Sequence, residues 1–495
     1  MSNGFLKGTR QWQRLYRSTI AALLTSSSLV TQCWLTQTAQ AQTLGYCWLS
    51  NDAIAQKQNF LVGTLKGNSD SENRYKALLK QHAEFLQQCR ARTWPNIQQI
   101  WLRLYPCDAR AGAIDEILDR LVSRGYNQVN VEVFSDGQVL LPSSENPTAW
   151  PSVVRTPKTE KIDLLAQIIQ KGHERGIRVY AWMFTMNFGY SYAQRSDRQG
   201  VLARNGRGET SLSFVKDGPQ VFIDPYSQQA KTDYYRLVQE ILKRRPDGVL
   251  FDYIRYPRGS GGDSVVTTVG DLWIYGDAAR QALYNRASNN QGRELITRYI
   301  RQGGVISPSD VAEVNKLYPN EQTPLWQGRT PSPTDTVGSL QWQLYQLSVA
   351  HAAQGVLDFL SLATLAAQRS GIRAGAVFFP DANQAVGQGG YDSRLQPWDR
   401  FPSSIEWHPM SYGVCGTTGC IEDLVRRVME RAPSGTQVIP ALAGNWAQSV
   451  NNRPSLEVQM QAIRQRIPGI NSISHFAFSW QDPQFDRDRK FCRLQ

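Results

Sequence analysis

The chain has 495 residues, of which 41% are hydrophobic and 19% are charged, and its formal net charge is +12. This composition is typical of globular proteins and excludes a disordered, fibrous or multispanning chain. Four of the positive charges lie in the first 41 residues, which contain no acid, and this leaves +8 of the +12 for the rest. The remaining basic residues are scattered, so the charge suits an acidic polymer or envelope surface and does not indicate nucleic acid.

The first 41 residues are typical of a secretory signal. A basic stretch precedes a short apolar run, and residues 39–41 (Ala-Gln-Ala) offer a small-x-small cleavage site. The apolar run is broken at residues 25–28, so it is too short and too polar for a retained transmembrane helix. We therefore expect cleavage after Ala41 and a secreted or periplasmic protein, with lipid attachment at Cys33 as the alternative. No later apolar run approaches the roughly 20 residues that span a bilayer, so no transmembrane segment is predicted.

The remainder contains an even number of cysteines, namely Cys47, Cys89, Cys107, Cys415, Cys420 and Cys492. An even number in an exported chain predicts disulfides, and buried thiols are the alternative. Cys415 and Cys420 bound a short glycine-rich loop that can close on itself. Pairs Cys47–Cys89 and Cys107–Cys492 would then fasten the two ends of the chain, although other pairings stay open. No CxxC motif or close His/Cys cluster indicates a metal site, and no metal or cofactor is predicted.

From residue 96 onward, apolar strand-like runs alternate with amphipathic helical runs. The strand-like runs are 100–105, 129–134, 179–184, 248–253, 374–379, 405–412, 437–443 and 473–480. Helical periodicity is clear at 113–124, 161–175, 228–245, 340–369, 421–432 and 454–467. Eight strands at this cadence predict an α/β fold, a closed (β/α)8 TIM barrel, with an open doubly wound sheet as the alternative.

Two segments depart from this cadence. The stretch of about 258–338, after the fourth strand, is rich in Gly, Ser, Asn and Pro, and insertions of this length are usually lids, binding walls or disordered segments. No helix is predicted after the last strand, and a helical run at 72–88 could cover the place of the missing eighth helix. We expect three parts: a signal peptide at 1–41, an N-terminal helical extension at 42–95 and the barrel domain at 96–495.

Side chains along a barrel strand alternate between the interior and the helix layer. Val129, Val131 and Val133 suit the helix layer, which turns Asn130 and Glu132 inward. The same parity turns inward Trp101, Arg103, Tyr105, Tyr180, Trp182, Leu250, Asp252, Glu406, His408 and Tyr412. Buried charges cost several kcal/mol each unless they are paired, so this interior is too polar for a barrel filled only for stability. Carboxylates beside Trp and Tyr predict a sugar site, and paired carboxylates cleave glycosidic bonds.

Several of these residues also have a structural interpretation. Arg103 and Glu132 lie on neighbouring strands and could form an ion pair. Glu406 opens its strand and could lie near the barrel floor, and His408 could be a hydrogen-bonded interior histidine. Trp182 could belong to the core.

Asp252 is the strongest catalytic candidate. It ends the apolar run 248–252, after which the chain turns away. In a TIM barrel, the C-terminal end of a strand is where catalytic groups lie.

The stretch 224–257 resembles the bacterial glycosyl hydrolase-like 10 family. It contains Asp-Pro-Tyr-Ser at 224–227 and Arg-Pro-Asp-Gly-Val-Leu-Phe-Asp-Tyr-Ile-Arg-Tyr-Pro at 245–257. Weaker matches follow the same order along the chain, at 176–182, 391–398, 408–412 and 476–480, so the resemblance covers about 100–482. It implies a TIM barrel that hydrolyses glycosidic bonds in extracellular or envelope polysaccharides.

The resemblance matches Asp252 to the first acid of the family's Phe-Asp-Asp-Tyr type motif. Tyr253 stands in place of the second acid. Because of this departure, either Glu132 or Glu406 serves as the second carboxylate, or the protein binds glycans without cleaving them.

The leading hypothesis is a secreted glycoside hydrolase in which Asp252 acts with Glu132 or Glu406. A carboxyl separation of about 5 Å would imply retention of configuration and one of about 6.5–9.5 Å inversion. The groups expected to bind substrate are Arg103, Asn130, Trp182, Tyr253, Arg255, His408, Tyr412 and Trp480. A catalytically silent glycan-binding barrel is the alternative. An enzyme of phosphate or nucleotide chemistry is disfavoured, because the glycine run at 259–262 lacks the Lys-Ser/Thr of a P-loop.

Overall fold

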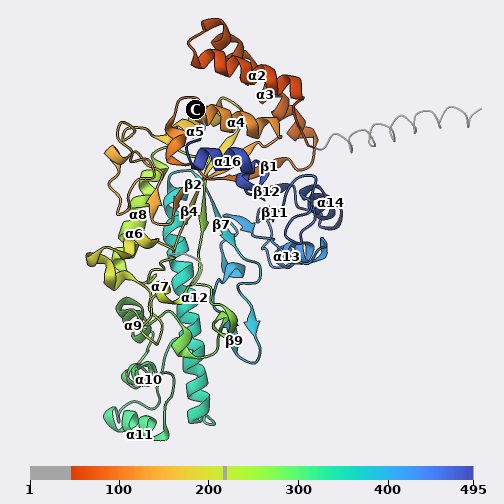
Figure 1. Ribbon diagram of the computed structural model, residues 1–495. Coiled ribbons are helices and arrows are strands. Elements are labelled where there is room, and N and C mark those ends of the chain that lie inside the picture. The colour runs from red at the N-terminus through yellow and green to blue at the C-terminus, as the bar shows by residue number, and fades with distance from the viewer. Residues whose placement is uncertain (1–45, 216–219, 494–495) are drawn as a thin grey trace, which may run out of the picture. The chain divides into compact units, whose positions relative to one another are not determined.

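The computed structural model describes residues 46–215 and 220–493. Its eight predicted strands form one parallel sheet in the order β10-β7-β5-β4-β2-β1-β12-β11 (Figure 1). They are β1 (Ile97–Leu102), β2 (Gln128–Ser135), β4 (Arg178–Phe184), β5 (Gly248–Asp252), β7 (Arg373–Phe378), β10 (Glu406–Pro409), β11 (Ala441–Ala443) and β12 (Ser472–Phe476). Parallel bridges from Trp407 to Val438 and from Met410 to Ala441 join the two ends of this order. The predicted (β/α)8 barrel is therefore confirmed.

All six predicted barrel helices are present. They are α4 (Ala113–Ser123), α5 (Leu164–His173), α8 (Gln228–Leu242), α12 (Val337–Arg369), α13 (Gly419–Met429) and α14 (Leu456–Arg466). In α4, Ile114, Ile117, Leu118 and Leu121 recur at helical spacing and are buried. Gly125 follows α4 with φ of +74°, the left-handed conformation that ends helices at glycine.

Two glycines make room for large side chains inside the barrel. A Cβ on Gly248 would lie 2.4 Å from the ring of Tyr180, and a Cβ on Gly375 would lie 2.7 Å from Leu250 and 3.1 Å from His408. Both sites are in β-strands, where glycine is otherwise unfavourable. Aromatic and imidazole rings therefore fit in the interior because the neighbouring strands carry glycine at the positions that face them.

The insertion after β5 is folded rather than irregular. It contains α9 (Asp277–Tyr284), α10 (Asn290–Arg301) and α11 (Pro308–Leu317), and α10 contacts α12 (Figure 1). A small antiparallel sheet lies beside them, in which β9 (Gly390–Asp392) pairs with β6 (Val265–Val266) and β8 (Ala385–Val386). The remaining short elements are β3 (Gln138–Val139), α6 (Tyr190–Ala193) and α7 (Ser211–Phe214).

The expectation of no helix after the last strand was wrong. The short helices α15 (Phe478–Gln481) and α16 (Pro483–Lys490) follow β12, and they contact β1 and the loop after it. The N-terminal extension is a pair of packed helices, α2 (Asn51–Leu65) and α3 (Ser69–Arg92). Because the C-terminal helices occupy the position beside β1, α3 packs against α4 instead.

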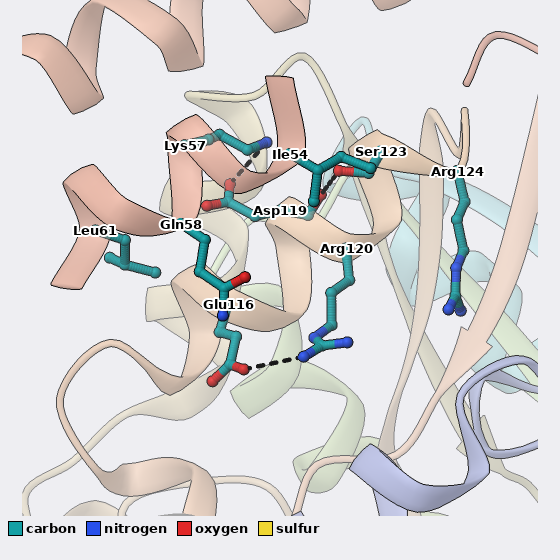
Figure 2. Close-up of a pocket in the computed structure, with 9 residues that line it drawn as sticks. All are labelled: Ile54, Lys57, Gln58, Leu61, Glu116, Asp119, Arg120, Ser123 and Arg124. Carbon is teal, nitrogen blue, oxygen red and sulfur yellow. Dashed lines mark hydrogen bonds and ion pairs between the residues drawn. The ribbon is translucent and has the colours of Figure 1, made fainter. Parts of the chain in front are cut away.

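A buried charged cluster joins the extension to the barrel. The carboxylate of Asp119 on α4 accepts hydrogen bonds from Tyr75 (2.8 Å) and Arg175 (2.9 Å) and lies 3.4 Å from the ammonium of Lys57. Figure 2 shows Lys57 reaching from α2 toward Asp119, beside a hollow of about 160 Å³. Burial lowers the pKa of Lys57, although the charge of Asp119 opposes this shift. The cluster spans three elements, so we interpret it as an anchor of the extension.

Two of the expected cysteine pairs are disulfides, Cys107–Cys492 and Cys415–Cys420. Cys47 and Cys89 are disulfide-bonded as well. Structural disulfides persist in oxidising compartments, so the folded chain belongs outside the cytoplasm. The expected signal peptide, its cleavage after Ala41 and the alternative at Cys33 lie outside the described residues.

One helix in the described part of the chain, α12, is long and apolar enough to cross a membrane by length and composition. In this structure it lies against β5, β7 and α8, and 56% of its most apolar window is buried. Core helices of soluble proteins pass the same test, so its apolar character reflects packing on the barrel.

Candidate active site

The site is built around Asp252, the last residue of β5. Its side chain is 7% exposed. One carboxylate oxygen accepts a hydrogen bond from the indole nitrogen of Trp182 (3.1 Å), and the other accepts from the backbone nitrogen of Tyr253 (2.6 Å). Trp182 comes from the neighbouring strand β4, and Tyr253 turns the chain out of the barrel with φ of +53°. The predicted position of Asp252 at the C-terminal end of its strand is therefore present in the structure.

Burial raises the pKa of Asp252 to about 6. The two hydrogen bonds and the charge of Arg255 stabilise the carboxylate and offset part of this shift, whereas the negative charge of Glu132 adds to it. A carboxyl group with such a pKa holds or releases a proton near neutral pH. Among the carboxylates proposed from the sequence, Glu132 is the one that acts electrostatically on Asp252.

Glu132 is held in a charged pair on β2. The guanidinium of Arg103 donates two parallel hydrogen bonds to its carboxylate, of 2.7 and 2.6 Å, and Ser135 donates a third. Burial lowers the pKa of Arg103, but the charge and hydrogen bonds of Glu132 outweigh that effect and raise it. This bidentate geometry fixes the orientation of Glu132. The ion pair that the sequence allowed is present, and the charge of Glu132 acts on Asp252.

Aromatic rings line the interior next to Asp252. Trp182 packs edge-on against Trp101 at 4.9 Å, and it also approaches Phe476, whose ring lies 5.6 Å from that of Tyr412. Tyr412 is half-buried, and both burial and the charge of Asp252 raise the pKa of its phenol. Trp101, Trp182 and Phe476 come from β1, β4 and β12, and Tyr412 follows β10; the contact between Trp101 and Trp182 confirms the inward parity expected for β1 and β4.

Arg255 lies on the loop that follows β5. Its guanidinium is buried, stacks over the ring of Tyr253 at 4.5 Å and over Phe222 at 5.5 Å, and donates one hydrogen bond to the carbonyl of Tyr256. Among the described residues, no carboxylate forms an ion pair with it, and burial lowers its pKa. Its positive charge lowers the pKa of Asp252, and its guanidinium lies against the surrounding aromatic rings.

Glu406 and His408 both lie on β10. Glu406 is the first residue of β10 and accepts a hydrogen bond from Tyr180 (3.0 Å), with the guanidinium of Arg373 at 3.6 Å. His408 lies 3.2 Å from Glu406 and is fully buried. Although burial raises the pKa of Glu406, these partners hold it below its ordinary value. His408 also packs edge-on against Trp101 at 6.3 Å, so it touches the ring cluster that includes Trp182, whereas Glu406 stands at the start of the strand.

The remaining candidates differ in position. Asn130 is buried and donates a hydrogen bond to Gln99, so it belongs to the interior network. Trp480 lies on α15 rather than in the last strand and is half-buried. Sequence reasoning missed Asp136, an exposed carboxylate just after β2 whose charge acts on Arg103. The signal that could have found it is an acid-glycine turn at the C-terminal end of a barrel strand.

The family model of the glycosyl hydrolase-like 10 proteins matches residues 97–302. The predicted resemblance is confirmed over these residues, which include Asp252, Glu132 and Arg255. Over this stretch the chain is similar to the glycosyl hydrolase-like 10 proteins. The curated "Glycosyl hydrolase DigH" of Escherichia coli K12 is 23% identical over 279 residues, as is the same protein of Shigella flexneri. That alignment covers 54% of this chain, and the chain spans about three fifths (61%) of the relative's length.

Solved structures with a similar arrangement are more distant in sequence. The PgaB (BpsB) glycoside hydrolase domain of Bordetella bronchiseptica is 14% identical with a TM-score of 0.45, over 80% of this chain and 99% of that one. A GH20 exo β-N-acetylglucosaminidase of Vibrio harveyi in complex with N-acetylglucosamine is 10% identical with a TM-score of 0.42, over 83% and 58% of the two chains.

Proposed function

We propose that the protein is an exported glycoside hydrolase that cleaves glycosidic bonds in an envelope or extracellular polysaccharide. The single observation that carries the proposal is the environment of Asp252, a buried carboxyl group at a strand end with a pKa raised to about 6. The family match over 97–302 supports the same reaction class. Export is supported by the disulfides and by the signal-like first 41 residues.

We assign Asp252 the role of general acid and base. Below pH 6 it carries the proton that a leaving glycosidic oxygen needs, and the indole of Trp182 stabilises the carboxylate that remains after transfer. Protonating the leaving oxygen removes the cost of expelling an alkoxide. The transition state then resembles an oxocarbenium ion. Water adds to the anomeric carbon, and the ionised Asp252 accepts its proton as general base, which restores the acid.

We assign Glu132 the role of the second carboxylate, because its charge acts on Asp252. The pair with Arg103 keeps it oriented, and a fixed carboxylate stabilises positive charge that develops at the sugar ring. The half-buried ring of Tyr412 would stack on the sugar, while the buried Trp182 and Arg255 would act through Asp252.

A catalytically silent glycan-binding barrel remains the second candidate. It is favoured by the commitment of both Glu132 oxygens to Arg103 and by Tyr253 after Asp252. The experiment that separates the two measures reducing ends released from purified cell-envelope glycan and exopolysaccharide. Release by the wild-type protein and its loss in Asp252→Asn would support hydrolysis. Binding without release in both proteins would establish the silent barrel.

A further inference from the structure

A groove of about 430 Å³ lies on the insertion, between the first turns of α12, the end of α10 and the loop that follows β6. Its volume falls within the range of small-molecule sites, about 300–1,000 Å³. None of the residues that line it is charged. Nothing in the barrel mechanism uses this groove.

An exposed indole forms one wall of the groove. Trp342 is 50% exposed, and its ring lies 5.6 Å from that of Tyr345, which is buried. The hydroxyl of Tyr345 donates to the backbone oxygens of Val266 (3.2 Å) and Gly389 (3.1 Å), so this second ring is held in place. A half-exposed tryptophan supported by a fixed tyrosine leaves an apolar face open to a ligand.

Uncharged hydrogen-bonding groups lie around the indole. The side-chain oxygen of Gln341 accepts from the backbone nitrogen of Ile306 (3.3 Å), which leaves its amide hydrogens to donate. Thr267 and Thr268, on the loop after β6, also line the groove and are exposed, and the hydroxyl of Thr268 donates to Asp271 and can accept from a ligand. Hydroxyl and amide groups beside an aromatic face match the hydroxyls and the C–H face of a neutral sugar. A phosphate or carboxylate ligand would find no cation in the lining.

The groove lies on the same side of the barrel as Asp252. Three residues separate the end of α12 from the start of β7, so the helix runs opposite to the strand and begins on the mouth side. Trp342 precedes Phe359 by 17 residues, or about 25 Å of helix at 1.5 Å per residue. Phe359 packs on Tyr234 beside the barrel. A small sheet connects the two regions: Thr267 of the groove follows β6, and Arg394, whose charge acts on Arg255, follows its partner strand β9.

We propose that this groove is a second glycan-binding site, which holds a neutral stretch of polysaccharide by stacking on Trp342. A strand bound at the groove and at the barrel mouth is held at two points. The second contact then forms at a high effective concentration, and long chains bind more tightly than short ones. The inference does not require the barrel to be catalytically active.

The test compares binding of the purified protein and of its variants to an array of neutral and acidic glycans of increasing length. Trp342→Ala should lose about tenfold or more in affinity for long neutral glycans, whereas Trp342→Phe should retain most of it. Phe85→Ala is the matched control, because Phe85 is an exposed aromatic residue on α3, outside the groove. It should bind like the wild-type protein.

A second readout keeps this site distinct from the barrel. Hydrolysis of a short soluble oligosaccharide should be unchanged in Trp342→Ala, and its thermal unfolding should match that of the wild type. The inference is overturned if Trp342→Ala binds every glycan as the wild type does, or if the wild type binds no neutral glycan. Loss of hydrolysis in Asp252→Asn with retained array binding would leave it standing.

Discussion

Trp182 donates its indole hydrogen to Asp252 across 3.1 Å, from the strand next to the one that ends at the acid. Two opposing effects meet at this contact. Burial favours the protonated carboxyl, whereas the indole and the backbone nitrogen of Tyr253 favour the carboxylate, and the resulting pKa is about 6. Both states of the acid are therefore accessible near neutral pH, which general acid-base catalysis requires.

Asp252→Asn removes the transferable proton while it keeps the volume, so hydrolysis should fall about 10²–10⁴-fold. Reducing-end release from the polysaccharide that proves to be the substrate measures this. Asp224→Asn is the matched control, because Asp224 is also buried with a pKa raised to about 6 but only binds the backbone nitrogens of Tyr226 and Ala279. It should lower the melting temperature and keep activity. Equal losses of activity in both variants would make Asp252 a structural acid.

The pH dependence follows from the same group. Because the protonated acid is the active form, kcat/KM should fall about tenfold per pH unit above about pH 6. Arg255 lowers the pKa of Asp252, so Arg255→Gln should move this limb to higher pH. The native state binds the proton more tightly than the unfolded chain does, so ionisation of Asp252 destabilises the fold as pH rises through 6. In chemical unfolding, the free energy of unfolding of Asp252→Asn relative to that of the wild type should therefore be higher at pH 8 than at pH 5. A limb that stays in place in Arg255→Gln would contradict this account.

The second catalytic carboxylate can be identified by comparing the variants Glu132→Gln and Glu406→Gln. Glu132→Gln should reduce activity by orders of magnitude, and it should move any residual pH limb downward because Glu132 raises the pKa of Asp252. Glu406→Gln should keep activity and lower the melting temperature, because it disturbs the buried contacts with Tyr180 and His408. Steady-state rates and thermal unfolding of both variants decide the matter. The reverse pattern would transfer the catalytic role to Glu406.

Removal of a single hydroxyl should show how much the buried charged cluster of the N-terminal extension stabilises the fold. Tyr75→Phe removes the hydroxyl that donates to Asp119 and accepts from Arg175, and this should cost about 1–3 kcal/mol of unfolding free energy. Tyr235→Phe is the control, since Tyr235 is an exposed tyrosine on α8 and should unfold like the wild type. Removing residues 42–95 exposes the apolar surface under α2 and α3 and should cause aggregation, seen by size-exclusion chromatography. A soluble, cooperatively unfolding 96–495 fragment would show that the extension is dispensable.

The barrel was predictable because its strands have a strong local signal. Each strand is a short apolar run that ends at a turn, and parity along the strand placed Trp182 and Asp252 inside before any contact was known. The alternation of side chains along a strand shows which ones point inward, but not how far along the barrel axis they lie. Glu406 shares the interior with Asp252 but lies at the opposite end of the barrel, because it begins its strand and Asp252 ends one.

The insertion was harder to predict because its composition obscured its local pattern. In α10, Leu295, Ile296, Tyr299 and Ile300 form a buried stripe, and Asn289 caps the helix through the backbone nitrogen of Gly292. These features indicate a helix, but the surrounding insertion is rich in Gly and Pro, and this composition predicted a loop. The groove beside Trp342 depends on contacts between segments more than 70 residues apart in the sequence, such as Thr267 and Tyr345, which no local pattern contains.

The Cys107–Cys492 disulfide and the pairing of β12 with β1 make closure of the barrel depend on the synthesis of residues 472–492. The first strand has β2 as a neighbour early, but its other edge stays open until the chain has been made at least to residue 476, and the covalent fastening waits until residue 492. A chain truncated before residue 472 would thus have a first strand that is still half-paired. Closure of the barrel would then depend less on how much of the chain exists than on whether residues 472–492 have been made.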